Sequence, residues 1–319
     1  MRNLNIAIVG CGNIGKKRLK AILNDKYTKI KFIVGPKKFD NSLKKLANSI
    51  QATYLNDWQD ILNKNLDAAI LSTPPEFFFD IGKNILKSSI NLLIEKPLGL
   101  NVKEAKFLTN LAKKKRLVLK TGFNLRFDDG VKAVKKILDN KINDIYFIKI
   151  SYVNGTVKTN KNNLGSLLDI GSHSVNLLNF LTNNKKLEVL NSSLQMNEYH
   201  KNDNGFIVIK IGKILSHIHH SFVRWENKFS LEIFYKQGSI ELYNLPKWGQ
   251  QVLIKSTRKY PSGFPKKYIK YFRSNKDNSW FNEWLHFKKL ILNKDFSNNN
   301  EGLINMSFLN NCLTKSNYI

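Results

Sequence analysis

The hydrophobic and polar positions of the first 122 residues follow two alternating patterns. Short apolar runs, most of them rich in β-branched residues, are separated by longer stretches in which apolar residues recur every three or four positions. The short runs are typical of buried strands, and the longer stretches are typical of amphipathic helices. The predicted strands are Leu4–Val9, Ile30–Val34, Asp67–Leu71, Asn91–Ile94 and Leu117–Thr121, and the predicted helices cover Arg18–Leu23, Ser42–Ser49, Phe78–Lys87 and Val102–Lys114. This alternation predicts a doubly wound parallel sheet.

Later in the chain, strand patterns follow one another directly. They cover Leu187–Met196, Gly205–Ile211, Leu215–Trp225, Phe229–Tyr235 and Ser239–Tyr243. Gln237-Gly238 is a hairpin signal between the last two, so we expect one sheet. Two helices are predicted after it, one capped by Ser279, whose aromatic spacing indicates core packing, and one over Glu301–Leu313. A length of 319 residues exceeds that of most single domains, which makes two domains the default expectation.

The composition, with 42% hydrophobic residues, is that of a globular protein. The apolar run at the N-terminus is too short for a signal peptide, and no later stretch approaches the length of a membrane span. The two cysteines, Cys11 and Cys312, provide neither a disulfide framework nor a set of metal ligands. We therefore expect a cytoplasmic protein with no membrane partner.

The formal net charge is +28, from 52 basic and 24 acidic residues. Such an excess invites a nucleic-acid interpretation, but the lysines are scattered along the whole chain. The densest runs, Lys113–Arg116 and Lys266–Lys270, are interpreted as solvated faces, and no nucleic-acid partner is expected. Attraction of anionic small molecules, nucleotide phosphates among them, is the more direct consequence of the charge.

A glycine pattern joins the first predicted strand to the first predicted helix. The sequence Gly10-Cys11-Gly12-Asn13-Ile14-Gly15 has the spacing GxGxxG. The first glycine permits a tight turn, the second lets the backbone approach a pyrophosphate, and the third allows close helix packing. A plain tight turn is the alternative, but the strand-to-helix context favours dinucleotide binding.

The end of the second strand bears on the choice of cofactor. A carboxylate there would accept hydrogen bonds from the ribose hydroxyls of NAD, but the chain continues as Gly35-Pro36-Lys37-Lys38. Two lysines and no carboxylate are compatible with the 2′-phosphate of NADP. Because exposed lysines are common in this chain, both NAD and NADP remain open.

Two further strand ends carry polar signals at the edge where such sheets bind ligands. One is Ser72-Thr73-Pro74-Pro75 and the other is Glu95-Lys96-Pro97. Lys96 is either a solvated loop residue or a cation directed into the cleft, with its direction fixed by the proline that follows.

The segment Gly165–Leu178 combines acid–base groups with apolar positions. If it is helical, Asp169, His173 and Asn176 project from one face. A carboxylate one turn from an imidazole can orient it and raise its pKa, which suits a group that exchanges a proton near neutral pH. The alternative is a helix with an incidental polar stripe.

Five motifs in this order, GCGNIG, STPP, EKPLGL, GFNLRF at Gly122–Phe127 and DIGSH, resemble the Gfo/Idh/MocA family of NAD(P)-dependent oxidoreductases. The segment Phe222–Ile233 also resembles members associated with surface-polysaccharide and nucleotide-sugar metabolism. The resemblance implies a Rossmann domain over residues 1–122. It also implies a substrate-binding and oligomerisation domain over 123–319, an α/β domain with a large, mainly antiparallel open sheet whose exposed face often makes a dimer or tetramer.

The resemblance also implies the roles of individual residues. Lys96, Asp169 and His173 match the catalytic positions, with His173 as general base, Lys96 bonded to the same substrate oxygen, and Asp169 holding the substrate or tuning His173. Asn124 and Arg126 are expected near the cofactor or the substrate. The residues expected at the cofactor are Gly10, Gly12, Asn13, Ile14, Gly15, Lys37, Lys38, Ser72, Thr73, Pro74, Glu95 and Lys96, and those expected at the substrate are Lys96, Asn124, Arg126, Asp169 and His173.

The chain departs from the family pattern at several points. Phe78 follows the TPP turn where many members have a histidine, and Asn176 stands where an aspartate is usual. The connection 151–163 is short and offers only Lys158 and Lys161 as cations, so the identity of the substrate cannot be carried over. A metal site at His217 and His219 is conceivable, but no carboxylate or cysteine lies at ligand spacing, and none is expected.

The predicted function is therefore hydride transfer between NAD or NADP and a secondary alcohol or ketone of a sugar or nucleotide-sugar, with a role in surface-polysaccharide metabolism. Two alternatives belong to other classes. One is a glycoside hydrolase or lyase that uses a tightly held NAD in a redox-neutral cycle. The other is a non-catalytic NAD(P)-binding sensor, against which the joint presence of Lys96, Asp169 and His173 argues.

Overall fold

The computed structural model describes residues 2–139, 141–155, 164–198, 201–273 and 277–318. The chain divides into two compact units that are not consecutive halves. The first is Met1–Asn124 with Trp280–Met306, and the second is Leu125–Ser279 with Ser307–Ile319. The sequence predicted a domain boundary between residues 122 and 123, with all later residues in the second domain. The observed division differs because residues 280–306 belong to the first unit.

The first unit contains the predicted parallel sheet. Its six strands have the order β3-β2-β1-β4-β5-β6, and every neighbouring pair is parallel. Their bounds are Leu4–Val9 (β1), Thr28–Val34 (β2), Thr53–Leu55 (β3), Ala68–Leu71 (β4), Asn91–Glu95 (β5) and Leu119–Gly122 (β6). Strand β3 was not predicted from the sequence, because three residues are too few to show a periodicity.

The helices of this unit are α1 (Asn13–Ile22), α2 (Asp40–Ser49), α3 (Phe78–Lys87) and α4 (Val102–Lys115). The start of α4 shows why the sequence forms a helix there. Asn101 Oδ1 accepts a hydrogen bond from Glu104 N, and the Glu104 carboxylate accepts one from Leu100 N. These reciprocal bonds satisfy backbone donors that the first turn of a helix leaves open.

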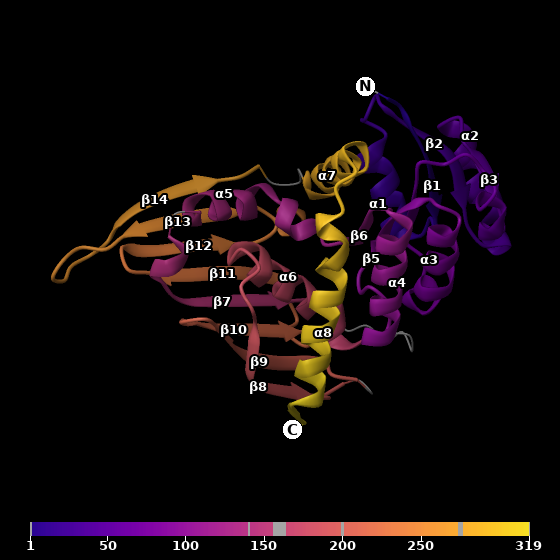
Figure 1. Ribbon diagram of the computed structural model, residues 1–319. Coiled ribbons are helices and arrows are strands. Elements are labelled where there is room, and N and C mark those ends of the chain that lie inside the picture. Colours follow the sequence, from indigo (N-terminus) through magenta and orange to yellow (C-terminus); the bar gives the residue numbers. More distant parts are fainter. Residues whose placement is uncertain (1, 140, 156–163, 199–200, 274–276, 319) are drawn as a thin grey trace. The chain divides into compact units, whose positions relative to one another are not determined.

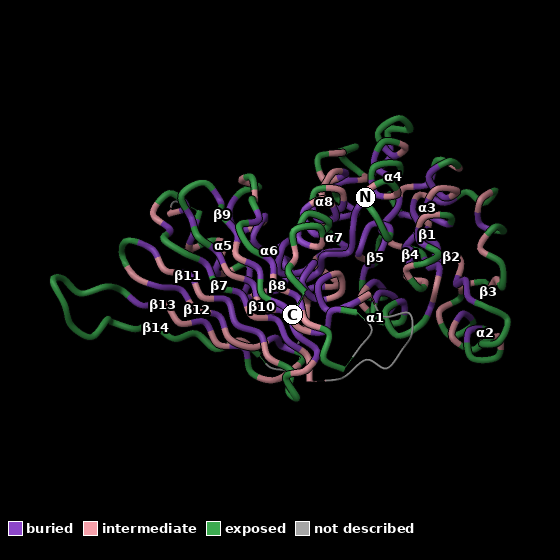
Figure 2. Tube along the Cα trace, turned by 90° about the horizontal axis from the view of Figure 1, so that it is seen from below, coloured by how far each residue is buried: buried purple, intermediate pink, exposed green. Residues whose placement is uncertain are grey.

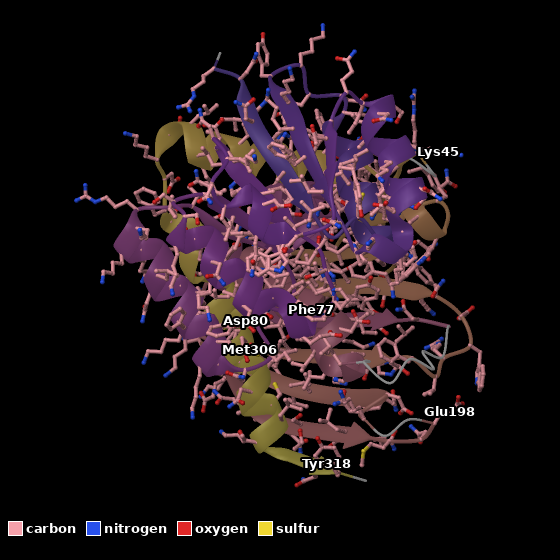
Figure 3. The ribbon with its side chains drawn as sticks, turned by 90° about the vertical axis from the view of Figure 1, so that its right-hand side faces the viewer. Lys45, Phe77, Asp80, Glu198, Met306 and Tyr318 are labelled. Atoms are coloured by element: carbon pink, nitrogen blue, oxygen red, sulfur yellow. The ribbon has the colours of Figure 1, made fainter. Side chains whose placement is uncertain are left out.

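The returning segment consists of α7 (Ser279–Asn293), a 3-10 turn at Ser297–Asn300 and the start of α8 (Glu301–Thr314). It belongs to the first unit because Trp284, Phe287 and Leu290 are buried in the same hydrophobic core as β1 and β2. Asp25 accepts hydrogen bonds from Trp284 Nε1 and Lys288 Nζ and so ties α7 to the residues that follow α1. Helix α8 passes from the first unit into the second after Met306, which is labelled in Figure 3.

The second unit is built on a nine-stranded sheet with the order β14-β13-β12-β11-β7-β10-β9-β8-β15 (Figure 1). It is mainly antiparallel, as predicted, and only the pairs β7/β10 and β8/β15 are parallel. The bounds are Ile145–Val153 (β7), Glu188–Gln195 (β8), Asn204–Ile211 (β9), Ile214–Ser221 (β10), Lys228–Tyr235 (β11), Gly238–Tyr243 (β12), Val252–Thr257 (β13), Lys266–Tyr271 (β14) and Ser316–Tyr318 (β15).

Helices cover one face of this sheet (Figure 1). They are α5 (Asp129–Leu138), α6 (Ser172–Leu181) and the end of α8, whose apolar side chains share one core with the strands. The opposite face carries exposed apolar side chains, among them Phe147, Phe206 and Leu215. The edge strand β14 is exposed along its whole length (Figure 2). Within the part of the chain that the structure describes, no helix is both long and apolar enough to span a membrane.

Candidate functional site

The glycine turn connects β1 to α1, and its geometry requires glycine at two positions. Gly10 has a φ of +87°, and a Cβ there would lie 2.5 Å from Thr73 N. A Cβ on Gly15 would lie 2.1 Å from Gly10 O. Both distances are far shorter than any side chain tolerates, so the first glycine allows the turn and the third allows the helix to pack against it.

Gly12 is not required by crowding, because a Cβ at this position would meet no heavy atom within 4 Å. Its φ is −75°, which any residue can adopt, so neither space nor backbone conformation explains the glycine. Gly12 also precedes the first turn of α1, which has no side-chain cap. The turn therefore leaves open space in front of uncapped backbone N–H groups, which is the arrangement that binds a phosphate.

The end of β4 completes this cradle. Ser72 Oγ donates a hydrogen bond of 2.6 Å to Gly10 O and holds the two strand ends together. Thr73 Oγ1 is buried, and among the described residues it has no hydrogen-bond partner. A buried hydroxyl without a partner is unusual in a folded protein and is consistent with a ligand that supplies one. These residues fit the pyrophosphate of a dinucleotide.

A substitution at Gly12 tests this interpretation. We expect Gly12→Ala to weaken NADPH binding by roughly tenfold to a hundredfold, because the added methyl group fills the space a phosphate needs and charge-assisted hydrogen bonds are lost. The midpoint of thermal unfolding should stay at the wild-type value. Gly15→Ala is the contrasting variant, since its clash with Gly10 O should lower that midpoint. Fluorescence titration and thermal unfolding provide the two readings, and unchanged NADPH affinity in Gly12→Ala would contradict the assignment.

The lysines expected at a 2′-phosphate lie in the 3-10 turn Lys37–Phe39 after β2, and both are exposed. Gly35, at the end of β2, is buried, and a Cβ there would lie 2.4 Å from Leu43 Cδ1 on α2. Glycine at this strand end leaves room for the Leu43 side chain of α2.

Glu95 and Lys96 at the end of β5 have separate environments. Glu95 is buried, and its carboxylate accepts a hydrogen bond of 2.7 Å from Arg18 Nε on α1. Burial raises the pKa of the Glu95 carboxyl, and the charge of Arg18 opposes this rise. Its side chain thus joins β5 to the helix that starts at the glycine turn. Lys96 is half-buried, and the Lys96–Pro97 peptide is cis.

In the second unit, Asp169 and His173 lie on one continuous helical segment. Asp169 belongs to the π-helical turn Leu167–Gly171, and His173 is the second residue of α6. The sequence predicted an ordinary helix here. A π-helical turn widens the helix by one residue and is frequent at functional sites. Asp169 is half-buried, and His173 and Asn176 are buried.

Two polar side chains hold the start of this segment. Asn202 Oδ1 accepts a hydrogen bond from Leu167 N, and Asn202 O accepts one from Ser166 N. His220 Nδ1 lies 2.9 Å from Ser166 Oγ, and burial lowers the pKa of His220 to about 3. A neutral, buried imidazole is therefore part of the support behind the motif.

Sequence reasoning missed the residues that surround His173. The ring of Tyr152 on β7 lies 6.0 Å from the His173 ring, and Trp248 lies 5.5 Å from Tyr152. Lys247 Nζ donates to Tyr152 Oη over 3.1 Å. No periodicity or motif links these positions, because Tyr152 is 21 residues from His173 and 95 residues from Lys247. The cation between Pro246 and Trp248 is a local signal in the sequence.

The 3-10 turn Asn124–Phe127 places Asn124 at the end of the first unit and Arg126 in the second, and both are buried. Arg126 lies over the ring of Phe127 at 4.9 Å. Asp128 follows and caps α5 by accepting a hydrogen bond from Val131 N.

Phe78, the departure after the TPP turn, is buried as part of α3, whereas its neighbour Phe77 is exposed (Figure 3). Asn13, Ile14 and Pro74 are exposed at the glycine turn and the strand end. Lys158 and Lys161 lie outside the described residues.

The histidine pair on β10 has structural contacts. His219 stacks on Phe206 with ring centres 4.4 Å apart, and its Nε2 lies 3.0 Å from Asn204 Oδ1. Burial lowers the pKa of His219 to about 4 and also lowers that of His217. Within the described residues, no group of three or more histidine, cysteine, aspartate or glutamate side chains is arranged to hold a metal ion.

The structure thus assembles two groups of predicted residues, each within its own unit. The first contains Gly10, Gly12, Gly15, Ser72 and Thr73, which meet where β1 and β4 end. The second contains Asp169 and His173 on one helical segment.

Known proteins match this chain in sequence and in fold. Residues 4–123 match the family model described as "Oxidoreductase family, NAD-binding Rossmann fold". The uncharacterized oxidoreductase YrbE of Bacillus subtilis is 29% identical over 147 residues, which cover 45% of this chain and 42% of that protein. The inositol 2-dehydrogenase/D-chiro-inositol 3-dehydrogenase of Lactiplantibacillus plantarum is 23% identical over 254 residues, which cover 76% of this chain and 72% of that protein.

A likeness of fold extends over the whole chain. The 3-ketoreductase KijD10 of Actinomadura kijaniata, solved with NADP and TDP-benzene, has a TM-score of 0.84 at 16% identity and covers 100% of this chain and 99% of its own. The sequence matches are shorter, since the chain spans about two fifths of the length of the first curated relatives it matches.

Proposed function

Since the chain carries the NAD-binding Rossmann domain of the Gfo/Idh/MocA oxidoreductase family, we propose that it is an NAD(P)-dependent oxidoreductase acting on a secondary alcohol or ketone of a sugar or nucleotide-sugar. The observation that carries the proposal is the glycine cradle, in which Gly12 leaves open space before α1 and Thr73 offers a buried hydroxyl. The inositol dehydrogenase among the relatives and the ketoreductase of similar fold support the substrate class.

In the proposed mechanism, each predicted catalytic residue has its own role. His173 accepts the proton of the substrate hydroxyl during oxidation and returns it during reduction, because a neutral imidazole has a ring nitrogen that can accept a proton and release it again. Lys96 donates a hydrogen bond to the same oxygen, whose negative charge grows during the reaction. Asp169 holds the substrate or orients His173. A bound nicotinamide supplies the hydride or accepts it.

The other cofactor contacts are proposed from where the residues lie, at the glycine turn and at the ends of strands β4 and β5. Gly10, Gly12, Asn13, Ile14 and Gly15 would bind the pyrophosphate with Ser72, Thr73 and Pro74, and Glu95 would act through its bond to Arg18. Asn124 and Arg126 are proposed to contact the substrate. Both are buried polar groups in one turn, which is typical of residues that a ligand or a network satisfies.

The cofactor preference depends on Lys37 and Lys38. We expect the double variant Lys37→Ala/Lys38→Ala to bind NADPH about three- to tenfold more weakly and NADH unchanged, since exposed charge pairs are weak and screened by salt. Side-by-side fluorescence titrations at low and moderate salt measure the affinities for NADPH and NADH. Lys45→Ala, which removes another exposed lysine of α2 (Figure 3), is the control. An equal loss for both cofactors would contradict a 2′-phosphate role.

We also propose that the protein is a cytoplasmic homodimer or homotetramer with a role in surface-polysaccharide metabolism. The open face of the nine-stranded sheet supports self-association, because Phe147 stacks on Phe234 at 4.7 Å and lies beside the exposed Leu215. Clustered exposed apolar residues mark interaction sites. Light scattering from the purified chain measures the assembly, and a monomer at micromolar concentration would contradict it.

A panel of sugars and nucleotide-sugars with NADH, NADPH, NAD or NADP tests the reaction itself. The dehydrogenase predicts a net change in nicotinamide absorbance with at least one substrate. Turnover without such a change would indicate the redox-neutral hydrolase or lyase. Binding of dinucleotide without any turnover would indicate the sensor.

A further inference from the structure

The surroundings of His173 contain a cation to which the proposed reaction assigns no role. Lys247 lies in the 3-10 turn Pro246–Trp248, and it is exposed. Its Nζ donates a hydrogen bond of 3.1 Å to Tyr152 Oη and lies 4.4 Å from the ring centre of Trp248. The ammonium group is thus placed against two aromatic side chains.

The loop that carries Lys247 is fixed from inside the second unit. Gln251, which is buried, donates to Asp128 Oδ1 over 2.9 Å and to Asn244 O over 3.2 Å. Trp248 N donates to Leu245 O, which closes the turn around Lys247. Because both ends of the loop are anchored, the lysine is held in place rather than carried on a free tip.

Tyr152 connects this cation to His173. Its side chain is only 4% exposed, and Phe229 packs edge-on against its ring at 5.9 Å. The His173 ring lies 6.0 Å from the Tyr152 ring centre, and Lys247 Nζ lies 5.6 Å from the same point. The proposed base and the cation therefore flank one rigid aromatic ring.

We infer that Lys247 and Trp248 form a subsite for an anionic group of the substrate, a phosphate or a carboxylate, next to the carbon that reacts at His173. This inference deepens the proposed function and rests on it, because it names the substrate class of that same site. An ammonium group forms charge-assisted hydrogen bonds with phosphate and carboxylate oxygens. The Trp248 ring offers an apolar face to the sugar that carries the anion. A neutral cyclitol would make no use of the charge.

The test measures binding to the protein loaded with its cofactor, by calorimetry, with three probes. UDP-glucose carries a diphosphate, glucuronate carries a carboxylate, and myo-inositol is neutral. We expect Lys247→Met to weaken binding of the preferred anionic probe by roughly tenfold to a hundredfold, and Lys247→Arg to retain most of it. Lys236→Met, which removes an exposed lysine from the turn between β11 and β12, should leave binding unchanged.

The probes also separate the two sources of negative charge. Stronger binding of UDP-glucose indicates a nucleotide-sugar, and stronger binding of glucuronate indicates a sugar acid. The inference is overturned if myo-inositol binds as tightly as the anionic probes, if no anionic probe binds, or if Lys247→Met matches the wild type. If anionic probes bind through Lys247 but no member of the sugar panel changes the nicotinamide absorbance, the subsite is upheld and the oxidoreductase is contradicted instead.

Discussion

Replacing Lys96 or His173 by alanine is expected to lower turnover by about a hundred- to ten-thousandfold, the range typical of a positioned acid–base group. His173→Ala removes the proton acceptor, and Lys96→Ala removes the donor to the substrate oxygen. Affinity for NADPH should change little in His173→Ala, because His173 lies on α6 of the second unit and the glycine cradle belongs to the first. Steady-state rates and cofactor titrations on the same preparations give both quantities.

A suitable control for these variants is Asn176→Ala. Asn176 is buried on the same helix three residues after His173, but no proton transfer is assigned to it. If Asn176→Ala lost as much activity as His173→Ala while keeping its fold, damage to α6 rather than loss of the base would explain both results. Wild-type turnover in either Lys96→Ala or His173→Ala would contradict the mechanism.

Glu283→Ala is expected to lower the free energy of unfolding by about 3–5 kcal/mol, the loss typical when one partner of a buried ion pair is removed. Glu283 on α7 is fully buried and forms an ion pair with Arg18, and Lys120 Nζ lies 3.7 Å from Glu283 Oε1. Without Glu283, Arg18 keeps Glu95 as a buried partner, and Lys120 loses a compensating charge.

Denaturant unfolding of Glu283→Ala measures this loss. The matched control is Asp80→Ala, which removes an exposed pair with Lys83 on α3 and should change stability by less than about 0.5 kcal/mol (Asp80 is labelled in Figure 3). A Glu283→Ala variant as stable as the control would show that α7 is not an integral part of the first unit. Residues 1–122 alone would keep the pair between Arg18 and Glu95 but would lack Glu283.

The sequence predicted the first unit well because its signals are local. Each strand of the parallel sheet except β3 overlaps a short, mainly apolar run, and the glycine turn lies within six residues. What it could not predict was the return of α7. The aromatic spacing of Trp284 and Phe287 indicated a buried face, but a pattern along one helix does not say which core buries it.

The second unit was predicted less completely for a related reason. Strand β14 is exposed on both faces and therefore lacks the alternation that reveals a half-buried strand. Its lysines were interpreted as a solvated face, which agrees with their exposure but hid the strand. Strands β7 and β13 were also missed, and with β7 the position of Tyr152 beside His173.

In the candidate site, too, local motifs were predictable from the sequence and contacts between distant residues were not. Motifs and the family resemblance predicted Lys96, Asp169 and His173 as catalytic residues, because motif matches need only residue types at short spacing. The pairing of Glu95 with Arg18 and the placement of Lys247 on Tyr152 depend on contacts between residues 77 and 95 positions apart. Such contacts are set by how strands and helices pack, which one sequence does not specify.

The most direct test of the central claim is to follow a hydride. NADPH or NADH with deuterium at both hydrogen positions of nicotinamide C4 is incubated with the protein and a keto-sugar nucleotide, and the product is analysed by mass spectrometry. An oxidoreductase predicts one deuterium on the new carbinol carbon for each cofactor oxidised, and loss of that transfer in Lys96→Ala and His173→Ala. A product that forms without deuterium and without net oxidation of the cofactor would contradict it.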